Sequence, residues 1–412
     1  MRFLYTAAIT LALPFILLRL CWRARLQPAY LQHVGERFAH YRSRKDSRPV
    51  IWLHAVSVGE TRAASPLIHA LHAQYPTHRI LITHMTPTGR ETGEALYGDN
   101  VERCYLPYDT PWAALRFLNH FHPVLGLLME TEIWPNLIRV CRRHAVPLHL
   151  VNARLSEKSF SGYQRMGQFA TQTIAALAGI AAQSEADAAR FRALGADHVS
   201  VMGNLKFDVP SNAEEITRGE RWKEALNGRP VILAASTREG EEALLLEAGL
   251  HAIENALLII VPRHPQRFDE VAVLLEKHNI AYQRRSSNTA IAQDTRVLLG
   301  DSMGEMAAYY ACSDVAFIGG SLLPFGGQNL IEACALGKPV LIGEHTYNFS
   351  EAAISAISAG AALRVTDAAD LVRKAGALLT HQDLATRMSA AALTFAQEHT
   401  GATQRLLGSL KL

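Results

Sequence analysis

The sequence is poor in cysteine and in charged residues, and each shortage excludes a class of protein. Its five cysteines are scattered, with no pair at the spacing of a metal or redox site: Cys21, Cys104, Cys141, Cys312 and Cys334. This usage excludes a disulfide framework and favours a reducing compartment. Charged residues make up 19% and the formal net charge is +3. That charge is too small to indicate a nucleic-acid partner.

Apolar residues are plentiful. They form 49% of the 412 residues, and no repeat or long biased segment interrupts them. A chain of this length exceeds the size at which one hydrophobic core usually stops growing. The composition therefore predicts two globular domains.

The first 25 residues are the most apolar part of the chain, with an uncharged run over residues 3–18. The run has no small-x-small cleavage site at a sensible distance, so we expect a retained membrane anchor over residues 1–25 and not a signal peptide. Basic residues follow it: Arg19, Arg23, Arg25, Arg37, Arg42, Arg44, Lys45 and Arg48. By the positive-inside rule they place the body of the protein in the cytoplasm, where they would meet anionic phospholipid. The alternative is an ordinary buried helix.

From residue 49 onward, short apolar runs rich in β-branched residues alternate with helical patterns. The first series lies at 49–54, 79–84, 124–130, 147–152, 179–184 and 199–204, and the second at 230–236, 256–263, 296–300, 315–320 and 339–343. Such alternation is typical of parallel sheets covered by helices. We predict an α/β protein with Rossmann-like domains at 26–212 and 213–412.

Polar clusters follow several of the predicted strands. Ligands of open parallel sheets bind at the carboxyl ends of the strands, so these clusters are candidate site residues. They lie at 54–60, 130–136, 203–208, 262–264 and 319–332. Because both halves contribute, we expect a cleft between the two domains.

The first cluster, HAVSVGE at 54–60, permits two interpretations of Glu60. Ser57 and Glu60 fit the S-x-x-E capping box, in which the glutamate satisfies backbone donors at a helix start. The same glutamate follows a glycine on a tight turn at the mouth of the sheet, where a carboxylate can accept a hydroxyl proton. The pattern leaves both open.

METEIWPN at 129–136 and GNLKFD at 203–208 carry the next candidates. If the segment is extended, Glu130 and Glu132 share a face, which suits acid/base work or a cation; the alternative is the preference of acids for a first helical turn. Lys206 offers a point charge for a phosphate or carboxylate, or is an ordinary loop lysine.

Two clusters in the second half suit anion binding. PRHP at 262–265 puts Arg263 directly after a very apolar strand, where a simple turn is the alternative. GGSLLPFGGQNLIE at 319–332 has two glycine pairs that let the backbone approach a ligand, followed by a helix expected near Asn329. Glu332 could accept hydrogen bonds from ribose hydroxyls.

Taken in order, these five motifs resemble the motif set of the bacterial transferases of 3-deoxy-D-manno-octulosonic acid (Kdo), over nearly the whole chain. The resemblance implies a GT-B fold, with the acceptor mainly in the first domain and the nucleotide sugar mainly in the second. It implies transfer of Kdo from CMP-Kdo to lipid IVA, the lipid A precursor of lipopolysaccharide, at the bacterial inner membrane. It implies inversion of configuration, with no metal and no cofactor.

The resemblance also implies roles for individual positions. Glu60 falls on the general base, and Glu130 and Lys206 fall on residues that support the transition state. The positions matching the CMP site are Pro262, Arg263, Met303, Gly304, Glu305, Asn329, Leu330, Ile331 and Glu332. The chain departs from the family at Gln328, where many relatives carry histidine.

Two other functions fit the same pattern of residues. One is a GT-B enzyme for a different nucleotide sugar, such as a UDP-sugar transferase or epimerase. The other is a membrane-anchored binding protein that has lost catalysis. Comparing how strongly CMP and UDP stabilise the folded protein separates the first alternative from a Kdo transferase. A function that does not depend on Glu60 would favour the second alternative.

Overall fold

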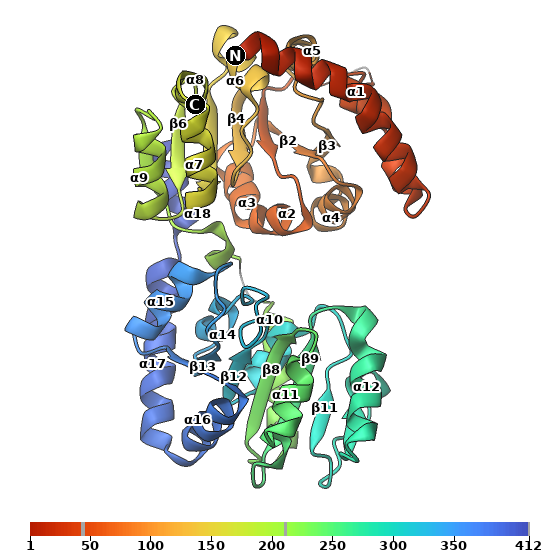
Figure 1. Ribbon diagram of the computed structural model, residues 1–412, viewed down its shortest axis with the longest axis vertical. Helices are drawn as coiled ribbons and strands as arrows, with labels where there is room; N and C mark the ends of the chain where they lie inside the picture. The colour runs from red at the N-terminus through yellow and green to blue at the C-terminus, as the bar shows by residue number, and fades with distance from the viewer. Residues whose placement is uncertain (43–45, 210–211, 411–412) are drawn as a thin grey trace. The chain divides into compact units, whose positions relative to one another are not determined.

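The structure is a computed structural model that describes residues 1–42, 46–209 and 212–410. The chain divides into two compact units, each built on one sheet (Figure 1). Unit 1 comprises Met1–Val209 and Thr400–Leu412, and unit 2 comprises Pro210–His399.

Unit 1 contains a parallel sheet of seven strands in the order β3-β2-β1-β4-β5-β6-β7. The strands are β1 (Val50–His54), β2 (Arg79–His84), β3 (Glu102–Tyr105), β4 (Pro123–Met129), β5 (Leu148–Ala153), β6 (Gly179–Ala182) and β7 (Val199–Val201). From β1 the chain adds strands on one side and then returns to add β4 on the other, so the strand order reverses between β1 and β4.

Helices cover both faces of this sheet, which is why its central strands carry apolar residues on both faces over most of their length. Trp52 packs into the core on one face, whereas Ile51 and Leu53 pack into the core on the other. The helices of unit 1 are α1 (Arg2–Ala24), α2 (Val58–Ala63), α3 (Ser65–Gln74), α4 (Pro87–Tyr97), α5 (Pro111–Phe121), α6 (Pro135–Arg143), α7 (Glu157–Arg165), α8 (Gln168–Ile174), α9 (Glu185–Ala193) and α18 (Ala402–Ser409), with 3-10 turns η1 (Pro28–Leu31), η2 (Val34–Phe38), η3 (Gly98–Asn100) and η4 (Leu205–Phe207).

Unit 2 repeats this plan with a parallel sheet in the order β10-β11-β9-β8-β12-β13-β14. Its strands are β8 (Val231–Thr237), β9 (Leu257–Pro262), β10 (Tyr282–Arg284), β11 (Val297–Leu299), β12 (Val315–Ile318), β13 (Val340–Ile342) and β14 (Ala362–Arg364). Here the strand order reverses between β8 and β12. The helices are α10 (Ala213–Ala225), α11 (Glu241–Glu247), α12 (Phe268–Lys277), α13 (Met306–Cys312), α14 (Ile331–Ala335), α15 (Ser350–Ser358), α16 (Ala368–Thr380) and α17 (Gln382–His399), with 3-10 turns η5 (Leu250–Ala252), η6 (Pro265–Arg267) and η7 (Arg285–Ser287).

The predicted α/β architecture is confirmed, and each predicted apolar run contains a strand. The sequence patterns missed β3, β10 and β14, which are edge strands. An edge strand is buried less than a central one, so it needs fewer apolar residues and carries a weaker signal. β10, for example, has no fully buried residue.

The N-terminal apolar run forms α1, of which only Leu20 is buried. Length and composition make it a candidate membrane span, and 6% of its apolar window is buried, so it is not a core helix. The expectation that Arg37 meets anionic phospholipid is wrong. Arg37 is 2% exposed, donates to the Met85 carbonyl and stacks on the Tyr105 ring. Arg44 and Lys45 lie outside the described residues.

The end of the chain returns to unit 1, whereas we expected residues 213–412 to form one domain. The reason is packing: Leu406 and Leu407 of α18 are buried in the unit 1 core with Ile51 and Leu53. Asp208 fixes the start of α18, because its carboxylate accepts the N–H groups of Gly401 at 2.7 Å and Thr403 at 2.6 Å. The aspartate of the GNLKFD motif therefore has a structural contact.

We predict that Asp208→Ala destabilises unit 1. The substitution removes the acceptor of free N–H groups at the start of α18, a loss of about 1–2 kcal/mol for helix caps. Urea unfolding followed by tryptophan fluorescence measures the change. Asp208→Asn, which keeps one acceptor oxygen, should lose less, and equal stability of Asp208→Ala and the unsubstituted protein would contradict this role.

Candidate active site

Each sheet has one position where the strand order reverses, and polar side chains gather at both. Open parallel sheets bind ligands at the carboxyl ends of the two strands that flank such a reversal, because the following loops diverge there. In unit 1 the flanking strands are β1 and β4, and in unit 2 they are β8 and β12. Glu60 follows β1 and Glu130 follows β4, so topology brings these two predicted residues to the same edge.

Glu60 lies in the first turn of α2 and is 9% exposed. Its carboxylate accepts the Val56 N–H at 2.9 Å and the Ser57 hydroxyl at 2.8 Å, and the Glu60 N–H donates to Ser57 Oγ at 3.4 Å. The interpretation of Ser57 as a helix cap is confirmed. Each carboxylate oxygen can accept two hydrogen bonds, so capping leaves Glu60 with capacity to accept another.

Burial raises the pKa of Glu60 to about 7, against the opposing effect of its hydrogen bonds from Val56 and Ser57. The neighbouring Glu130 and Glu132 raise the pKa further through charge repulsion. A carboxyl group with this pKa exchanges its proton near neutral pH, which suits a general base. The environment of Glu60 thus differs from that of an exposed capping glutamate.

Glu130 pairs with Lys206, with 3.2 Å between Oε1 and Nζ. Lys206 lies on η4, which contacts α2, the helix that carries Glu60. The three residues predicted as catalytic, Glu60, Glu130 and Lys206, therefore lie at one site in unit 1.

The expectation that Glu130 and Glu132 share a face of an extended segment is wrong. Glu130 has a φ of 57°, in the left-handed region, so the chain turns directly after β4. A residue other than glycine in this region is strained, and such residues cluster at functional sites. The turn sends Glu130 to Lys206, whereas Glu132 accepts the Trp134 indole N–H at 2.9 Å.

A buried histidine completes this edge of the sheet. His54 Nδ1 lies 2.9 Å from the Thr83 hydroxyl, and His54 Nε2 lies 4.0 Å from Glu132. Burial lowers the pKa of His54 to about 3, so the ring is neutral near pH 7. Within the described residues, no group of three or more His, Cys, Asp or Glu side chains could hold a metal ion.

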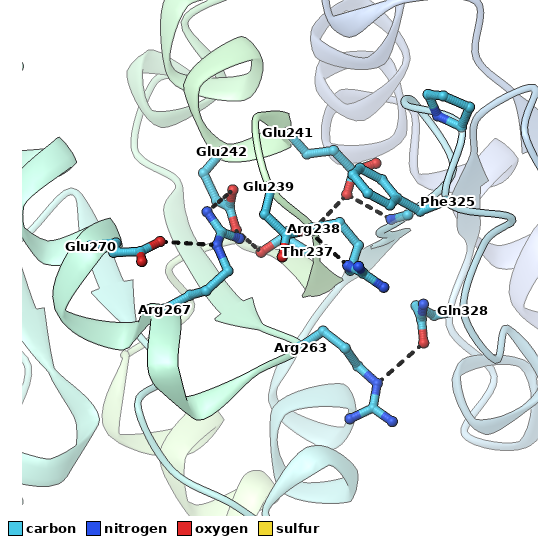
Figure 2. A network of polar contacts seen from close by, with 12 residues as sticks. Thr237, Arg238, Glu239, Glu241, Glu242, Arg263, Arg267, Glu270, Phe325 and Gln328 are labelled. Carbon is cyan, nitrogen blue, oxygen red and sulfur yellow. Dashed lines mark hydrogen bonds and ion pairs between the residues drawn. The ribbon is translucent and has the colours of Figure 1, made fainter. Parts of the chain in front are cut away.

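In unit 2, Pro262 ends β9 and Arg263 follows it. The Arg263 N–H donates to the Thr237 carbonyl at the end of β8, and its Nε donates to Gln328 at 3.3 Å. Figure 2 shows Arg263 and Gln328 pointing toward one another. The structure therefore joins the predicted PRHP and glycine-rich segments, through the residue at which this chain departs from the family pattern.

The end of the glycine-rich segment forms a compact turn. Asn329 donates to Glu332 at 2.9 Å and accepts the Ile331 N–H at 3.1 Å. α14 begins at Ile331, two residues after the predicted start. Leu330 and Ile331 are buried in the core, so only their backbone atoms are available to a ligand.

The segment with Met303, Gly304 and Glu305 follows β11, the neighbour of β9. Met303 is 61% exposed. Glu305 accepts the Ser302 hydroxyl at 2.6 Å and pairs with Arg218 and Arg285. Strand order places this segment next to the Pro262 turn, and the charge of Glu305 is balanced by the two arginines.

Glu241 is a residue of this edge that the sequence patterns missed. Its buried carboxylate accepts the N–H groups of Arg238 at 2.9 Å, Gly320 at 2.6 Å and Leu322 at 3.0 Å. It thereby ties the loop after β8 to the glycine-rich loop after β12, and Arg238 stacks on Phe325 in the same network (Figure 2). The acidic run after β8 was visible in the sequence, but its partner loop is about 80 residues away and only strand order reveals it.

Two family models match the chain. One, described as 3-Deoxy-D-manno-octulosonic-acid transferase (kdotransferase), matches residues 32–209, and the other, Glycosyl transferases group 1, matches residues 253–395. Together with two parallel sheets and a polar site at each reversal of strand order, they define a glycosyltransferase of the GT-B fold, as predicted.

Two relatives narrow this class. A 3-deoxy-D-manno-octulosonic acid transferase of Bordetella pertussis is 46% identical over 373 residues, covering 88% of this chain and 86% of that protein. One of Haemophilus influenzae is 38% identical, covering 100% of this chain and 98% of that protein. The chain belongs to the 3-deoxy-D-manno-octulosonic acid (Kdo) transferase family.

Solved structures with lower identity share the fold. A putative UDP-N-acetylglucosamine 2-epimerase from Listeria monocytogenes is 16% identical, with a TM-score of 0.61 over 88% of this chain and 96% of that one. At this identity the likeness concerns the arrangement of the elements alone.

We predict that Glu241→Gln destabilises unit 2, because it sets an amide NH₂ against backbone donors that now share a carboxylate. A buried donor left without an acceptor costs about 1–3 kcal/mol. Denaturant unfolding measures the change. Glu239→Gln is the matched control, since that side chain is 51% exposed and its ion pair with Arg238 lies at the surface. Equal stability of the two variants would contradict the role of Glu241.

Proposed function

We propose that this Kdo transferase moves Kdo from CMP-Kdo to lipid IVA in lipopolysaccharide biosynthesis, without a metal ion, and that Glu60 is its general base. The observation that supports this most is the environment of Glu60. Its carboxyl group is buried, has a pKa of about 7, and lies at the strand reversal with the Glu130–Lys206 pair.

In the proposed reaction, Glu60 removes the proton from a sugar hydroxyl of the acceptor. The hydroxyl oxygen bonds to the anomeric carbon of Kdo while the bond from that carbon to the phosphate oxygen breaks, and CMP leaves with the electron pair. Configuration inverts because attack and departure occur on opposite sides. One proton moves to Glu60, and nothing is oxidised or reduced, so the step needs no other reactant.

The other site residues supply charge for this step. Lys206 is the candidate to offset negative charge in the transition state, and Glu130 holds its ammonium group at 3.2 Å. In unit 2, Arg263 and the backbone around Asn329 and Glu332 are candidates for CMP. The proposed donor site also includes Pro262, Met303, Gly304, Glu305, Leu330 and Ile331.

The exposed apolar helix α1 supports attachment to a membrane. We propose that the protein works on the cytoplasmic face of the bacterial inner membrane, where basic residues of the N-terminal region meet anionic lipid. A lipid acceptor gives a reason for such attachment.

Mass measurement of the lipid product tests the function. Incubated with lipid IVA and freshly generated CMP-Kdo, without added metal, the protein should add the mass of Kdo, and Glu60→Gln should lower the rate at least 100-fold, because general bases contribute about 10²–10⁴. Glu132→Gln, a substitution of the neighbouring acid, should stay within about tenfold. No added mass with the unsubstituted protein would refute the function, whereas normal rates with folded Glu60→Gln would refute only the base.

The pH dependence gives a second test of Glu60. Only the ionised carboxylate can accept a proton, so kcat/KM should rise as pH increases through about 7. The Ser57 hydroxyl stabilises the ionised form, so Ser57→Ala should raise the pKa and move this limb to higher pH by about one pH unit. Ser57→Thr retains the hydroxyl and should restore the original limb. An unshifted limb in Ser57→Ala would contradict the assignment.

A further inference from the structure

A basic pocket lies in unit 1 where α1 begins, and its lining includes none of Glu60, Glu130 and Lys206. It has a volume of about 520 Å³ and is lined by residues of α1, α6 and α8. Four of its lining residues are arginines: Arg2, Arg139, Arg142 and Arg143. Three of them lie on α6, where Arg142 and Arg143 follow Arg139 by three and four residues and so share its face of the helix. The lining contains no acidic residue.

The charges of these arginines are not balanced within the protein. Among the residues that the structure describes, none of the four forms an ion pair with a carboxylate, and Arg2 Nε is buried with no hydrogen-bond partner. Burial and the nearby Arg2 and Arg143 lower the pKa of Arg139. An anion in the pocket would relieve this repulsion, and guanidinium groups match the oxygens of a phosphate in pairs.

The walls of the pocket are held together by a shared carboxylate. Asp109 accepts the Tyr5 hydroxyl of α1 at 2.8 Å and also the N–H groups of Asn136 and Leu137 at the start of α6. Thr6 donates to Asn136 at 3.0 Å. These contacts fix the first turns of α1 against α6, so hydrogen bonds between its walls define the shape of the pocket.

The helix that begins at this pocket carries an apolar face with no cover in the structure. Leu4, Leu11, Phe15, Leu18 and Trp22 are 61–73% exposed and recur at helical spacing. A helix of 23 residues is roughly 34 Å long, enough to cross a bilayer. The contacts of Tyr5 and Thr6, however, keep the N-terminus of α1 against unit 1, and the C-terminus of α1 leads into the same unit. Both ends of the helix therefore face the same side of a bilayer.

We propose that α1 lies along the membrane surface with this face in the acyl layer, and that the arginine pocket at its start binds the phosphate of an anionic phospholipid headgroup. The contacts of Tyr5 and Thr6 hold the start of the apolar helix beside the pocket, which puts the pocket at headgroup depth. The inference deepens the proposed membrane attachment and does not depend on the reaction.

Binding to lipid vesicles, measured without donor or acceptor, tests the site. The protein should prefer vesicles containing phosphatidylglycerol to those of phosphatidylcholine alone. The triple variant Arg139→Gln, Arg142→Gln, Arg143→Gln should lose about 100-fold in affinity for the former, since each basic residue near an anionic surface contributes about fivefold. The matched control removes three exposed arginines of unit 2, Arg221→Gln, Arg296→Gln and Arg387→Gln, and should bind normally.

A second variant separates a phosphate site from general attraction. The same three positions changed to lysine keep the charge but lose the paired N–H geometry, so binding should fall at least tenfold. Lysine binding equal to arginine, or equal losses in the control variant, would overturn the pocket. Inorganic phosphate that stabilises the protein through these arginines, with vesicle binding unchanged in the glutamine variant, would overturn the lipid assignment.

The orientation of α1 is tested with a protease-cleavable tag before Met1 and another after Leu412. In inverted inner-membrane vesicles both tags should be cleaved, and in intact spheroplasts neither should be. An N-terminal tag cleaved only in spheroplasts would mean that α1 crosses the membrane and would overturn the proposal. These measurements require no transfer activity, so they remain informative if the proposed reaction is wrong.

Discussion

The reversal of strand order in each sheet is the constraint on which the sites depend. A chain that adds parallel strands first on one side of its initial strand and then on the other must send two neighbouring loops in opposite directions. In unit 1 these loops follow β1 and β4, and in unit 2 they follow β8 and β12. The space that they leave is where backbone donors and polar side chains can face a ligand. The family motifs lie at or next to these loops.

Both reversals hold a buried glutamate in the first helical turn after the initial strand, but the two are used differently. Glu60 accepts a backbone N–H from its own turn and keeps capacity for another proton donor, with a pKa raised to about 7 by burial. Glu241 accepts three N–H groups and joins its turn to the loop after β12. One position thus provides a candidate base in unit 1 and a fixed loop in unit 2.

Local sequence patterns predicted what depends on local physics. The central strands carry apolar residues on both of their faces because helices cover both faces of each sheet, and the Ser57 cap follows from four consecutive residues. Patterns failed where distant segments decide. The left-handed turn at Glu130 gives no local signal, the contacts of Glu241 lie 79 and 81 residues away, and the return of α18 to unit 1 depends on its packing partners. Roles in the reaction came from resemblance, since a carboxylate at a helix start is compatible with a cap or a base.

In the proposed reaction, the nucleotide of the donor binds at the reversal in unit 2 and the acceptor reacts at the reversal in unit 1. Amide hydrogen exchange of the full-length protein, measured with and without CMP, tests this division between the two units. CMP should slow exchange in the loops of unit 2, at residues 237–242, 263–264 and 319–332, with no comparable change at 55–60 and 130–132. Protection confined to the loops after β1 and β4 would contradict it.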